Sequence, residues 1–539
     1  MSKVALKSTR ITTGTTSQRI DGYVLITDDT IEAVLEKGMI DSLKLKDYEV
    51  EDYGDFPILP GFCDFHVHLV NTATILRDGD LRSTRSEEEA AKTLWEIHKN
   101  GEPRKVIMGG AWDNVLWGQK SPPRKETLDK YFPETPVFLL NNECHSAWVN
   151  SKALELFHIT KDTPDPPHGY FHRDEEGNPT GFLHEEAVFT LQDRIFEMMD
   201  EEEIGNYAKS FIEEANRYGI TSLGDVVGVS GVNYKAYQHL LDMNQLNARI
   251  FFYLEFEKEV EEIQKVMAHY SGSMLKCNGV KAFIDGTPQG YTGYMLEEYT
   301  DCKGETSFPL HQPEDLFEKV CAFDQEGIQV RIHACGDAGV RLCLDAYENA
   351  IKVNGTDNRR HCIEHIEAIS PEDIPRFGKL GVVASIQPEH LPKYVFEDHP
   401  FHRILGEERM KYCWPIGSIL KSGGPLVFGT DSPVAPLNPT RGLYRAVNRL
   451  TNYGTPKGGW NPWDRISMQE AVSAYTQGGA YAAHMDKEIG TLEPGKKADI
   501  TVLEKDVFEN QQNLEVMLDV KAVMTMVNGK TVYRKQEEK

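Results

Sequence analysis

The sequence predicts an α/β protein: a (β/α)8 TIM barrel with an inserted α/β subdomain after its first strand, and a small β-sandwich built from both termini. Three observations lead to this prediction. Apolar, strand-like runs alternate with helical patterns through the middle of the chain. Short strands separated by turn residues occupy both ends. Residues of metal-ligand type stand where several of the middle strands end.

The two ends of the chain show the same pattern of short apolar runs separated by turn residues. Residues 22–27 form an apolar run that stops at Asp28 and Asp29. Comparable runs return only at residues 498–503 and 520–533, where Asn528-Gly529 is a hairpin turn signal. Neither end is long enough to bury a core of its own. We therefore expect residues 1–58 and 489–539 to form one composite β-sandwich domain, with the barrel, residues 59–488, inserted between them.

The middle of the chain contains eight strand-like runs. Several are followed by candidate helices, at residues 313–326, 338–353, 371–380 and 414–421. Eight strand–helix units predict a closed barrel rather than an open sheet. The eight runs are residues 58–68, 220–227, 249–256, 279–285, 328–333, 361–365, 382–388 and 426–431.

The interval between the first and second runs is too long for one crossover, at about 150 residues. It contains its own strand-like runs, at 104–109 and 135–141, and helical patterns at 86–100 and 185–199. We interpret residues 71–218 as a subdomain inserted after the first strand. Loops at the carboxyl ends of barrel strands build active sites, so this insertion is expected to cover the active site and shape a substrate pocket.

Five residues at predicted strand ends are of the kinds that bind divalent metals. His66 and His68 lie two apart on one strand, so both can face the barrel interior and chelate one ion. Closing the barrel makes the eighth strand a neighbour of the first, which brings Asp431 beside this pair. His333 and His365 end the adjacent fifth and sixth strands and point to a second position. This order suits two neighbouring divalent metals that activate water.

The fourth strand offers a ligand that could bridge two metals. Lys281 is embedded in the apolar run of residues 279–285. A buried ammonium is costly and its pKa falls readily, which leaves a neutral amine that can react with carbon dioxide. We expect a CO2-derived carbamate on Lys281 between two divalent metal ions. Histidine, carboxylate and carbamate ligands suit zinc, which we expect here, although manganese, iron and cobalt also fit.

Composition restricts the class of partner and the compartment. With 84 acidic and 58 basic residues the formal charge is -26, which repels nucleic acid and anionic membranes. No run approaches the roughly 18 apolar residues of a membrane span, and the N-terminus lacks an apolar signal core. The nine cysteines include no C-x-x-C pair, so a reducing, cytoplasmic location is expected. A small-molecule substrate fits best, and a homo-oligomer is left open.

A set of short motifs in family order resembles the amidohydrolase superfamily. Within it, the sequence is most similar to the YtcJ-like branch of amidohydrolase family 3, which includes N-substituted formamide deformylases. The resemblance runs nearly from end to end. The motifs are Leu59-Pro60-Gly61-Phe62 with His66 and His68, Val280-Lys281, Asp285-Gly286, His333-Ala334, Gly336-Asp337, Ile363-Glu364-His365, Gly429-Thr430-Asp431 and Gly490-Thr491-Leu492-Glu493-Pro494-Gly495.

The resemblance implies a role for each ligand residue. His66, His68 and Asp431 would bind one metal, His333 and His365 the other, and carbamylated Lys281 would bridge them. Asp431 would also act as the catalytic general base and later pass its proton to the leaving amine. The sequence departs from the family pattern at Arg331, where a neutral residue is more usual.

Further residues are candidates for supporting roles. The insertion resembles the same branch through Trp112-Asp113 and through the segment that begins with His145 and contains Trp148, so these two tryptophans and His145 are predicted to bind substrate. Asp337 and Glu364 are predicted to orient His333 and His365, because ligand histidines usually hydrogen-bond a carboxylate through their second ring nitrogen.

Three functions from different classes fit the fold. The first is a metal-dependent amidohydrolase that cleaves an amide or formamide carbon–nitrogen bond other than a peptide bond. The second is a mononuclear aminohydrolase that deaminates a heterocycle. Such deaminases usually carry a glutamate three residues after the fifth-strand histidine, where this chain has Gly336, and they lack the lysine. The third is a non-catalytic scaffold, but scaffolds typically lose ligands, and every expected ligand is present here.

Overall fold

The computed structural model confirms the predicted α/β barrel. It describes residues 2–16, 18–40, 44–101, 103–114, 116–119, 121–167, 169–226, 232–356, 358–392 and 399–536. One sheet contains eight parallel strands in the order β18-β17-β16-β15-β14-β13-β12-β6. These strands are β6 (Phe62–Val67), β12 (Ile220–Asp225), β13 (Arg249–Glu255), β14 (Leu275–Phe283), β15 (Gln329–Ala334), β16 (Cys362–His365), β17 (Val383–Ile386) and β18 (Leu426–Phe428).

The two edge strands of this sheet approach each other just beyond their carboxyl ends. Val67 and Ser432 form an isolated parallel bridge, and the His68 N–H donates to the Ser432 carbonyl at 3.0 Å. The Asp431 N–H donates to the His66 carbonyl at 2.7 Å. Backbone hydrogen bonds therefore hold Asp431 beside the first-strand histidines, as the closed-barrel prediction requires.

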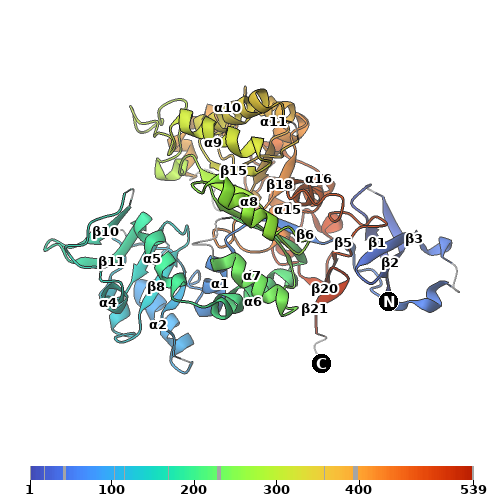
Figure 1. Cartoon of the computed structure of the whole chain (residues 1–539), viewed down its shortest axis with the longest axis horizontal. Helices are drawn as coiled ribbons and strands as arrows, with labels where there is room; N and C mark the ends of the chain where they lie inside the picture. Colours follow the sequence, from blue (N-terminus) through green and yellow to red (C-terminus); the bar gives the residue numbers. More distant parts are fainter. Residues whose placement is uncertain are drawn as a thin grey trace.

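Helices cover the outside of the barrel, as Figure 1 shows for the labelled helices α7, α8, α9, α10 and α11. The four helices predicted between strands are present, with some ends shortened by a few residues. They are α9 (Pro313–Gln325), α10 (Asp337–Asn354), α11 (Ile374–Leu380) and α14 (Ile416–Lys421). Other surrounding helices include α6 (Glu201–Arg217), α7 (Val232–Asp242), α8 (Val260–His269), α15 (Pro439–Asn448), α16 (Met468–Ala474) and α17 (Gln477–Ala482).

The predicted first strand, residues 58–68, is two strands in different sheets. β5 (Ile58–Pro60) pairs with β1 and β19 of the terminal sheet, whereas β6 begins at Phe62 in the barrel. The chain changes sheets at Gly61, where a Cβ atom would lie 2.2 Å from the hydroxyl oxygen of Thr221. Only glycine fits this crossing, so one apolar run serves two sheets. The predicted end of the second run, Val227, lies outside the described residues.

Strands from both ends of the chain form one sheet, ordered β21-β20-β19-β5-β1-β2-β3, with β4 paired to β1. Apolar residues of β1, β2, β19 and β20 share one hydrophobic cluster. In Figure 1 this sheet lies at the right, beside the barrel. The further strands are β1 (Lys3–Thr12), β2 (Arg19–Thr27), β3 (Thr30–Glu36), β4 (Glu49–Asp52), β19 (Ile500–Leu503), β20 (Ala522–Val527) and β21 (Lys530–Arg534).

A buried ion pair joins this terminal sheet to the barrel. Arg249 begins β13 and donates from Nε to Asp499 Oδ2 at 2.6 Å and from Nη2 to Asp499 Oδ1 at 3.0 Å. Asp499 immediately precedes β19. Both side chains are buried, so the two charges neutralise each other where the sheets meet.

The long interval after the first barrel strand has its own five-stranded sheet, ordered β10-β11-β9-β8-β7. Figure 1 shows this sheet on the side of the barrel away from the terminal strands. Its strands are β7 (Ile107–Trp112), β8 (Val137–Asn141), β9 (Ser146–Val149), β10 (Gly169–Arg173) and β11 (Pro179–Glu185), and its helices are α1 (Leu69–Asp78), α2 (Glu87–His98), α3 (Lys125–Asp129), α4 (Ser151–Leu156) and α5 (Glu186–Glu197).

All nine cysteines are free. Within the part of the chain that the structure describes, no helix has both the length and the apolar character required to cross a bilayer.

Candidate metal centre

The predicted ligand residues meet at the carboxyl ends of the barrel strands. The rings of His333 and His365 lie 4.4 Å apart, those of His66 and His365 4.9 Å, and those of His66 and His68 5.7 Å. The ends of three strands, β6, β15 and β16, thus bring four imidazoles to one place. His66, His333 and His365 are buried, whereas the His68 side chain is 23% exposed and lies at the rim.

Asp431 lies among these imidazoles. Its Oδ1 atom is 3.1 Å from His68 Nε2 and 3.4 Å from His66 Nε2, and its Oδ2 atom is 3.9 Å from His365 Nδ1. Burial raises the pKa of this carboxyl, but the neighbouring imidazoles outweigh burial and hold it well below its usual range. Asp431 is therefore an anion at neutral pH.

The backbone at these ligands departs from ordinary strand geometry. Asp431 has φ of 58° and His365 has φ of 72°, in the left-handed region that side chains other than glycine rarely adopt. Such conformations cost about 1–3 kcal/mol each and are kept mainly at functional sites. Close packing adds to the constraint: a Cβ atom at Gly429 would lie 2.6 Å from the backbone nitrogen of His66.

The side chains present fit a divalent cation. One ligand atom from each of His66, His365 and Asp431 lies within 4.8 Å of the other two. Asp431 Oδ1 and His365 Nδ1 are buried without a hydrogen-bond partner, which is costly unless a ligand satisfies them. Burial lowers the pKa of His333 to about 3 and that of His365 well below its usual range, so both imidazoles are neutral and free to donate lone pairs.

The three closest ligand atoms come from both of the predicted metal positions. Sequence reasoning assigned His66 and Asp431 to one position and His365 to the other, yet the structure groups all three. The assignment of ligands to two separate ions therefore stays a prediction.

A buried hydrogen-bonded chain orients His66. Glu364 Oε2 accepts from His66 Nδ1 at 2.5 Å, and Glu364 Oε1 accepts from Arg331 Nε at 2.7 Å. Arg331 is fully buried, stacks on Phe65 and Tyr253, and donates from Nη2 to the Phe65 carbonyl at 2.8 Å. A proton on Nδ1 of His66 leaves the Nε2 lone pair facing Asp431. Arg331, which departs from the family pattern, thus helps to fix the orientation of His66 through Glu364.

This chain corrects one predicted contact. We expected Glu364 to orient its sequence neighbour His365, but its side chain bonds His66 on a distant strand. The reason is that neighbouring residues on a strand point to opposite sides, so the side chain of Glu364 is directed away from that of His365.

Replacing Glu364 with Gln is expected to lower metal affinity about 10–100-fold, because His66 loses its charged partner. The guanidinium of Arg331 also loses its anion, which should cost about 3–5 kcal/mol of unfolding free energy. Metal titration and thermal unfolding measure the two effects. The control is Asp499→Asn, which breaks the buried pair with Arg249 and should lower stability without changing metal affinity. An unchanged metal affinity in Glu364→Gln would refute the orienting role.

Lys281 lies inside the barrel on β14, close to the end that carries the ligands. Its side chain is buried, with Nζ 3.8 Å from the centroid of the Phe283 ring. Burial lowers its pKa to about 8, although the charges of Glu364 and Asp431 act in the opposite direction. A substantial fraction of the amine is therefore neutral near physiological pH, which is the form that reacts with carbon dioxide.

The carboxylate nearest His333 is Asp285 rather than the predicted Asp337. Asp285 Oδ1 lies 3.8 Å from His333 Nε2, and its two oxygens accept backbone N–H groups of Cys335, Gly336 and Tyr294 at 2.8–3.0 Å. Asp337 instead accepts the Leu296 N–H at 2.8 Å at the start of α10. Its carboxylate therefore holds the loop that follows β14 against the start of α10.

One residue at the centre was missed by sequence reasoning. His390, in the short 3-10 turn η4 (Pro388–His390), has its Nε2 atom 3.5 Å from Asp431 Oδ2 and its ring stacked 5.9 Å from that of His365. Arg441 and Arg445 hold the adjacent Glu389 through bonds of 2.8 and 2.9 Å. The only sequence signal was its position after the seventh strand.

The predicted substrate-binding residues separate into two groups. Trp112 and Trp148 are 1% and 0% exposed in the hydrophobic core of the insertion, and their indole N–H groups donate to the carbonyls of Leu139 and Arg124, each at 2.9 Å. Both have the surroundings of core side chains rather than of a pocket wall. The His145 side chain is 40% exposed and hydrogen-bonds Glu185 at 2.9 Å. It is therefore accessible to a substrate.

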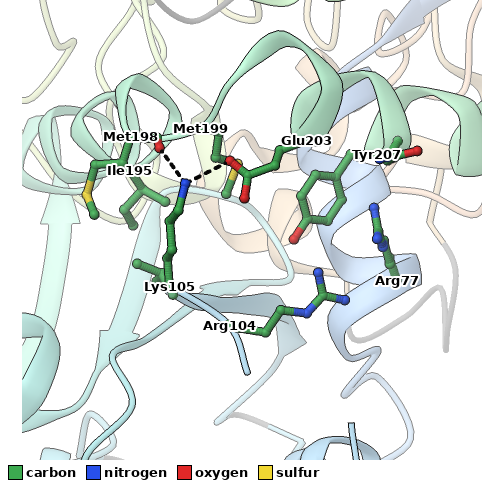
Figure 2. A pocket seen from close by; sticks show the side chains of 10 residues that line it. Arg77, Arg104, Lys105, Ile195, Met198, Met199, Glu203 and Tyr207 are labelled. Atoms are coloured by element: carbon green, nitrogen blue, oxygen red, sulfur yellow. Dashed lines mark hydrogen bonds and ion pairs between the residues drawn. The ribbon is translucent and has the colours of Figure 1, made fainter. Parts of the chain in front are cut away.

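A pocket with several cationic side chains lies away from these ligands, between the insertion and α6 (Figure 2). Lys105 donates to Glu203 at 3.0 Å and to the Met198 carbonyl at 3.2 Å. Arg104 pairs with Asp78 at 3.4 Å, and the guanidinium of Arg77 lies over the Tyr207 ring. Each cation thus has a partner within the protein. The pocket lies where the insertion packs against α6.

Comparisons with known proteins identify the family and the fold. A family model described as the amidohydrolase family matches residues 50–533. "Protein LONG AFTER FAR-RED 3" of Arabidopsis thaliana is 31% identical over 88% of this chain and 82% of its own length. "N-substituted formamide deformylase" of Arthrobacter pascens is 26% identical over 90% of each chain.

A similar solved structure is that of an uncharacterized metal-dependent hydrolase from Pyrococcus furiosus. It is 27% identical and has a TM-score of 0.76. The match covers 94% of this chain and 100% of that structure. The resemblance inferred from the short motifs is therefore confirmed at the level of family and fold.

Proposed function

Because the chain belongs to the amidohydrolase family, we propose that it is a metal-dependent hydrolase that cleaves an amide or formamide C–N bond in a small molecule. The observation that carries the proposal is the convergence of His66, His365 and Asp431, with two buried ligand atoms that lack a hydrogen-bond partner. The N-substituted formamide deformylase among its relatives supports the bond type. Free cysteines are consistent with the cytoplasm.

The proposed cofactors are two divalent ions, with zinc as the first choice. His66, His68 and Asp431 would hold one, and His333 and His365 the other, with the Lys281 carbamate between them. Forming the carbamate joins the neutral Nζ to the carbon of CO2 and releases one proton. When bound, the cations would polarise the substrate carbonyl and lower the pKa of water towards neutrality.

The protein side chains would then move the protons. Asp431 is ionised and enclosed by imidazoles, so one of its oxygens can accept a proton from the attacking water. Glu364 keeps the proton of His66 on Nδ1, which preserves the orientation of that ring through the reaction. Arg331 keeps Glu364 ionised, because its charge lowers the pKa of this buried carboxyl.

The deaminase alternative has less support. Relatives of that kind place a glutamate at the position of Gly336, and here a Cβ atom at this position would lie 2.1 Å from the Tyr294 carbonyl oxygen. A glutamate could not occupy the site without moving the backbone. The buried Lys281, which suits two metals, also favours a binuclear centre over a mononuclear one.

Metal analysis beside a substrate panel tests the proposal. Purified protein should contain divalent metal and hydrolyse some members of a series of N-formyl and N-acyl amines. His66→Ala and His333→Ala should each lose metal and activity while keeping the circular dichroism of a folded barrel. His269→Ala, which removes an exposed histidine at the end of α8, is the control and should change neither. Full metal content and turnover in His66→Ala would refute the assigned centre.

A further inference from the structure

We propose that His145, held by Glu185, donates a proton to the leaving nitrogen when the C–N bond breaks. This inference rests on the proposed hydrolytic function and deepens it. It places one catalytic side chain on the insertion, opposite the metal ligands of the barrel, and so gives the insertion a chemical role.

The sheet of the insertion sets the pair in register. β9 and β11 are antiparallel, and Ser146 lies opposite His184. The next residues outward are His145 and Glu185, joined by a hydrogen bond of 2.9 Å from the Glu185 N–H to the His145 carbonyl. Their side chains meet as well, with His145 Nδ1 2.9 Å from Glu185 Oε2. When Nδ1 donates to this carboxylate, Nε2 is left for another group.

Both ends of this contact have unusual backbone geometry. Glu185 has φ of 50° and ψ of -124°, and Cys144, just before His145, has φ of 63°. Residues other than glycine pay about 1–3 kcal/mol for such conformations, which persist where the surrounding structure enforces them. The fold thus fixes the direction of the imidazole at a cost in strain, which indicates a role beyond packing.

The insertion that carries the pair is tied to the segment that leaves the metal ligands. Helix α5 starts directly after Glu185, and Gln192 on this helix donates to Asn71 Oδ1 at 2.8 Å. Asn71 follows His68 by three residues, so α5 is tied to the segment that leaves the metal ligands. Cys144, which precedes His145, packs against the large hydrophobic cluster that contains side chains of both the insertion and the barrel.

Charge links the pair to the centre. Burial lowers the pKa of His145, but Glu185, Glu143 and Asp431 raise it by more, so its pKa lies above the usual value for histidine. In turn, the charge of His145 lowers the pKa of His184, which lies beside Glu185 on β11. The charged groups that act on His145 therefore come from both the insertion and the barrel, and they favour its protonated form.

Accessibility separates His145 from Asp431. The Asp431 side chain is 7% exposed and enclosed by ligand imidazoles, whereas that of His145 is 40% exposed. A substrate whose carbonyl lies at the metal ligands has its amine portion outside them, where a group on the insertion can reach it. Proton removal from water and proton delivery to nitrogen would then use different side chains.

The step balances as follows. Water adds to the carbonyl carbon and gives one proton to Asp431. The C–N bond of the tetrahedral intermediate breaks, its electron pair stays on nitrogen, and nitrogen takes a proton from Nε2 of His145. The products are a carboxylic acid, which ionises, and a neutral amine. His145 regains a proton from solvent, and Asp431 releases one to it.

A series of leaving groups tests the inference. The substrates are N-acyl amines whose leaving amines range from strongly basic alkylamines to weakly basic nitroanilines, assayed with wild type, His145→Gln and Glu185→Gln. General acid catalysis contributes about 10²–10⁴-fold and is needed least by weakly basic leaving groups. His145→Gln should therefore lose about 10²–10⁴-fold in kcat with alkylamines and less than about 10-fold with nitroanilides.

Two further measurements make the result decisive. The metal content and circular dichroism of His145→Gln should match those of wild type. The control is His184→Gln: His184 directly precedes Glu185, its side chain is exposed to a similar extent as that of His145, and its loss should not depend on the leaving group. If His145→Gln fails to fold, Glu185→Gln carries the same comparison. Equal losses across the series, with an active wild type, would overturn this inference alone. A wild type that hydrolyses no member would overturn the proposed function and the inference with it.

Discussion

Asp431→Asn is expected to lower kcat by about 10²–10⁴-fold while the protein keeps part of its metal. The amide has nearly the shape of the carboxylate, and its carbonyl oxygen can still face the imidazoles of His66 and His68. It cannot accept a proton from water at neutral pH. The loss should therefore fall on turnover rather than on folding, and kcat measured beside metal content separates the two.

The control for this variant is a second buried aspartate far from the ligands. Asp464 is 1% exposed and accepts the Ser418 N–H at 2.7 Å. Asp464→Asn is expected to change stability at most, with kcat per folded molecule unaltered. Near-normal kcat in Asp431→Asn would remove this residue from the role of base, even if it still binds metal.

Lys281→Ala is expected to abolish activity and to lower the metal content. A buried ammonium beside two dications would be repelled strongly, whereas a carbamate supplies two oxygens and a negative charge. Burial lowers the pKa of Lys281 to about 8, so the neutral amine is available to react with CO2. A short-chain carboxylic acid in the medium should restore part of the activity, because it can occupy the space of the lost bridge.

A second lysine on the same strand is the control for Lys281. Lys276 lies near the start of β14 and donates from Nζ to the Ala483 carbonyl at 3.0 Å. Lys276→Ala should keep metal and activity, and the added acid should have no effect on it. Wild-type apoprotein rebuilt with metal should also regain activity faster when bicarbonate is supplied. A bare amine at Lys281 in an active, metal-loaded protein would favour a mononuclear centre.

The order of elements could be predicted from the sequence because it rests on local patterns. Apolar runs and helical periodicity identified the eight parallel strands, the insertion and the β-rich ends. The main error was at residues 58–68, where one apolar run is shared by two sheets. The change occurs at Gly61 because Thr221 from another strand leaves no room for a side chain. That contact lies about 160 residues away and has no local signature.

The gathering of the ligands could be predicted for a related reason. Residues that end parallel strands of one barrel must meet at the same edge, so the positions of His66, His333, His365 and Asp431 follow from strand order. Nothing comparable applied to His390, which lies in a turn after β17. Its side chain reaches Asp431 from a turn that Arg441 and Arg445 on α15 hold through Glu389.

The sequence by itself determined the barrel, the kinds of ligand and the edge at which they meet, since these depend on the repeat of strands and on residue type. Only the tertiary structure decided the partners of each polar side chain. It joined Glu364 to His66, set the Gly286 carbonyl rather than Asp337 against His333, and placed Trp112 and Trp148 in a core. A hydrogen bond depends on the positions of two atoms to within a few tenths of an ångström, and distant strands set those positions.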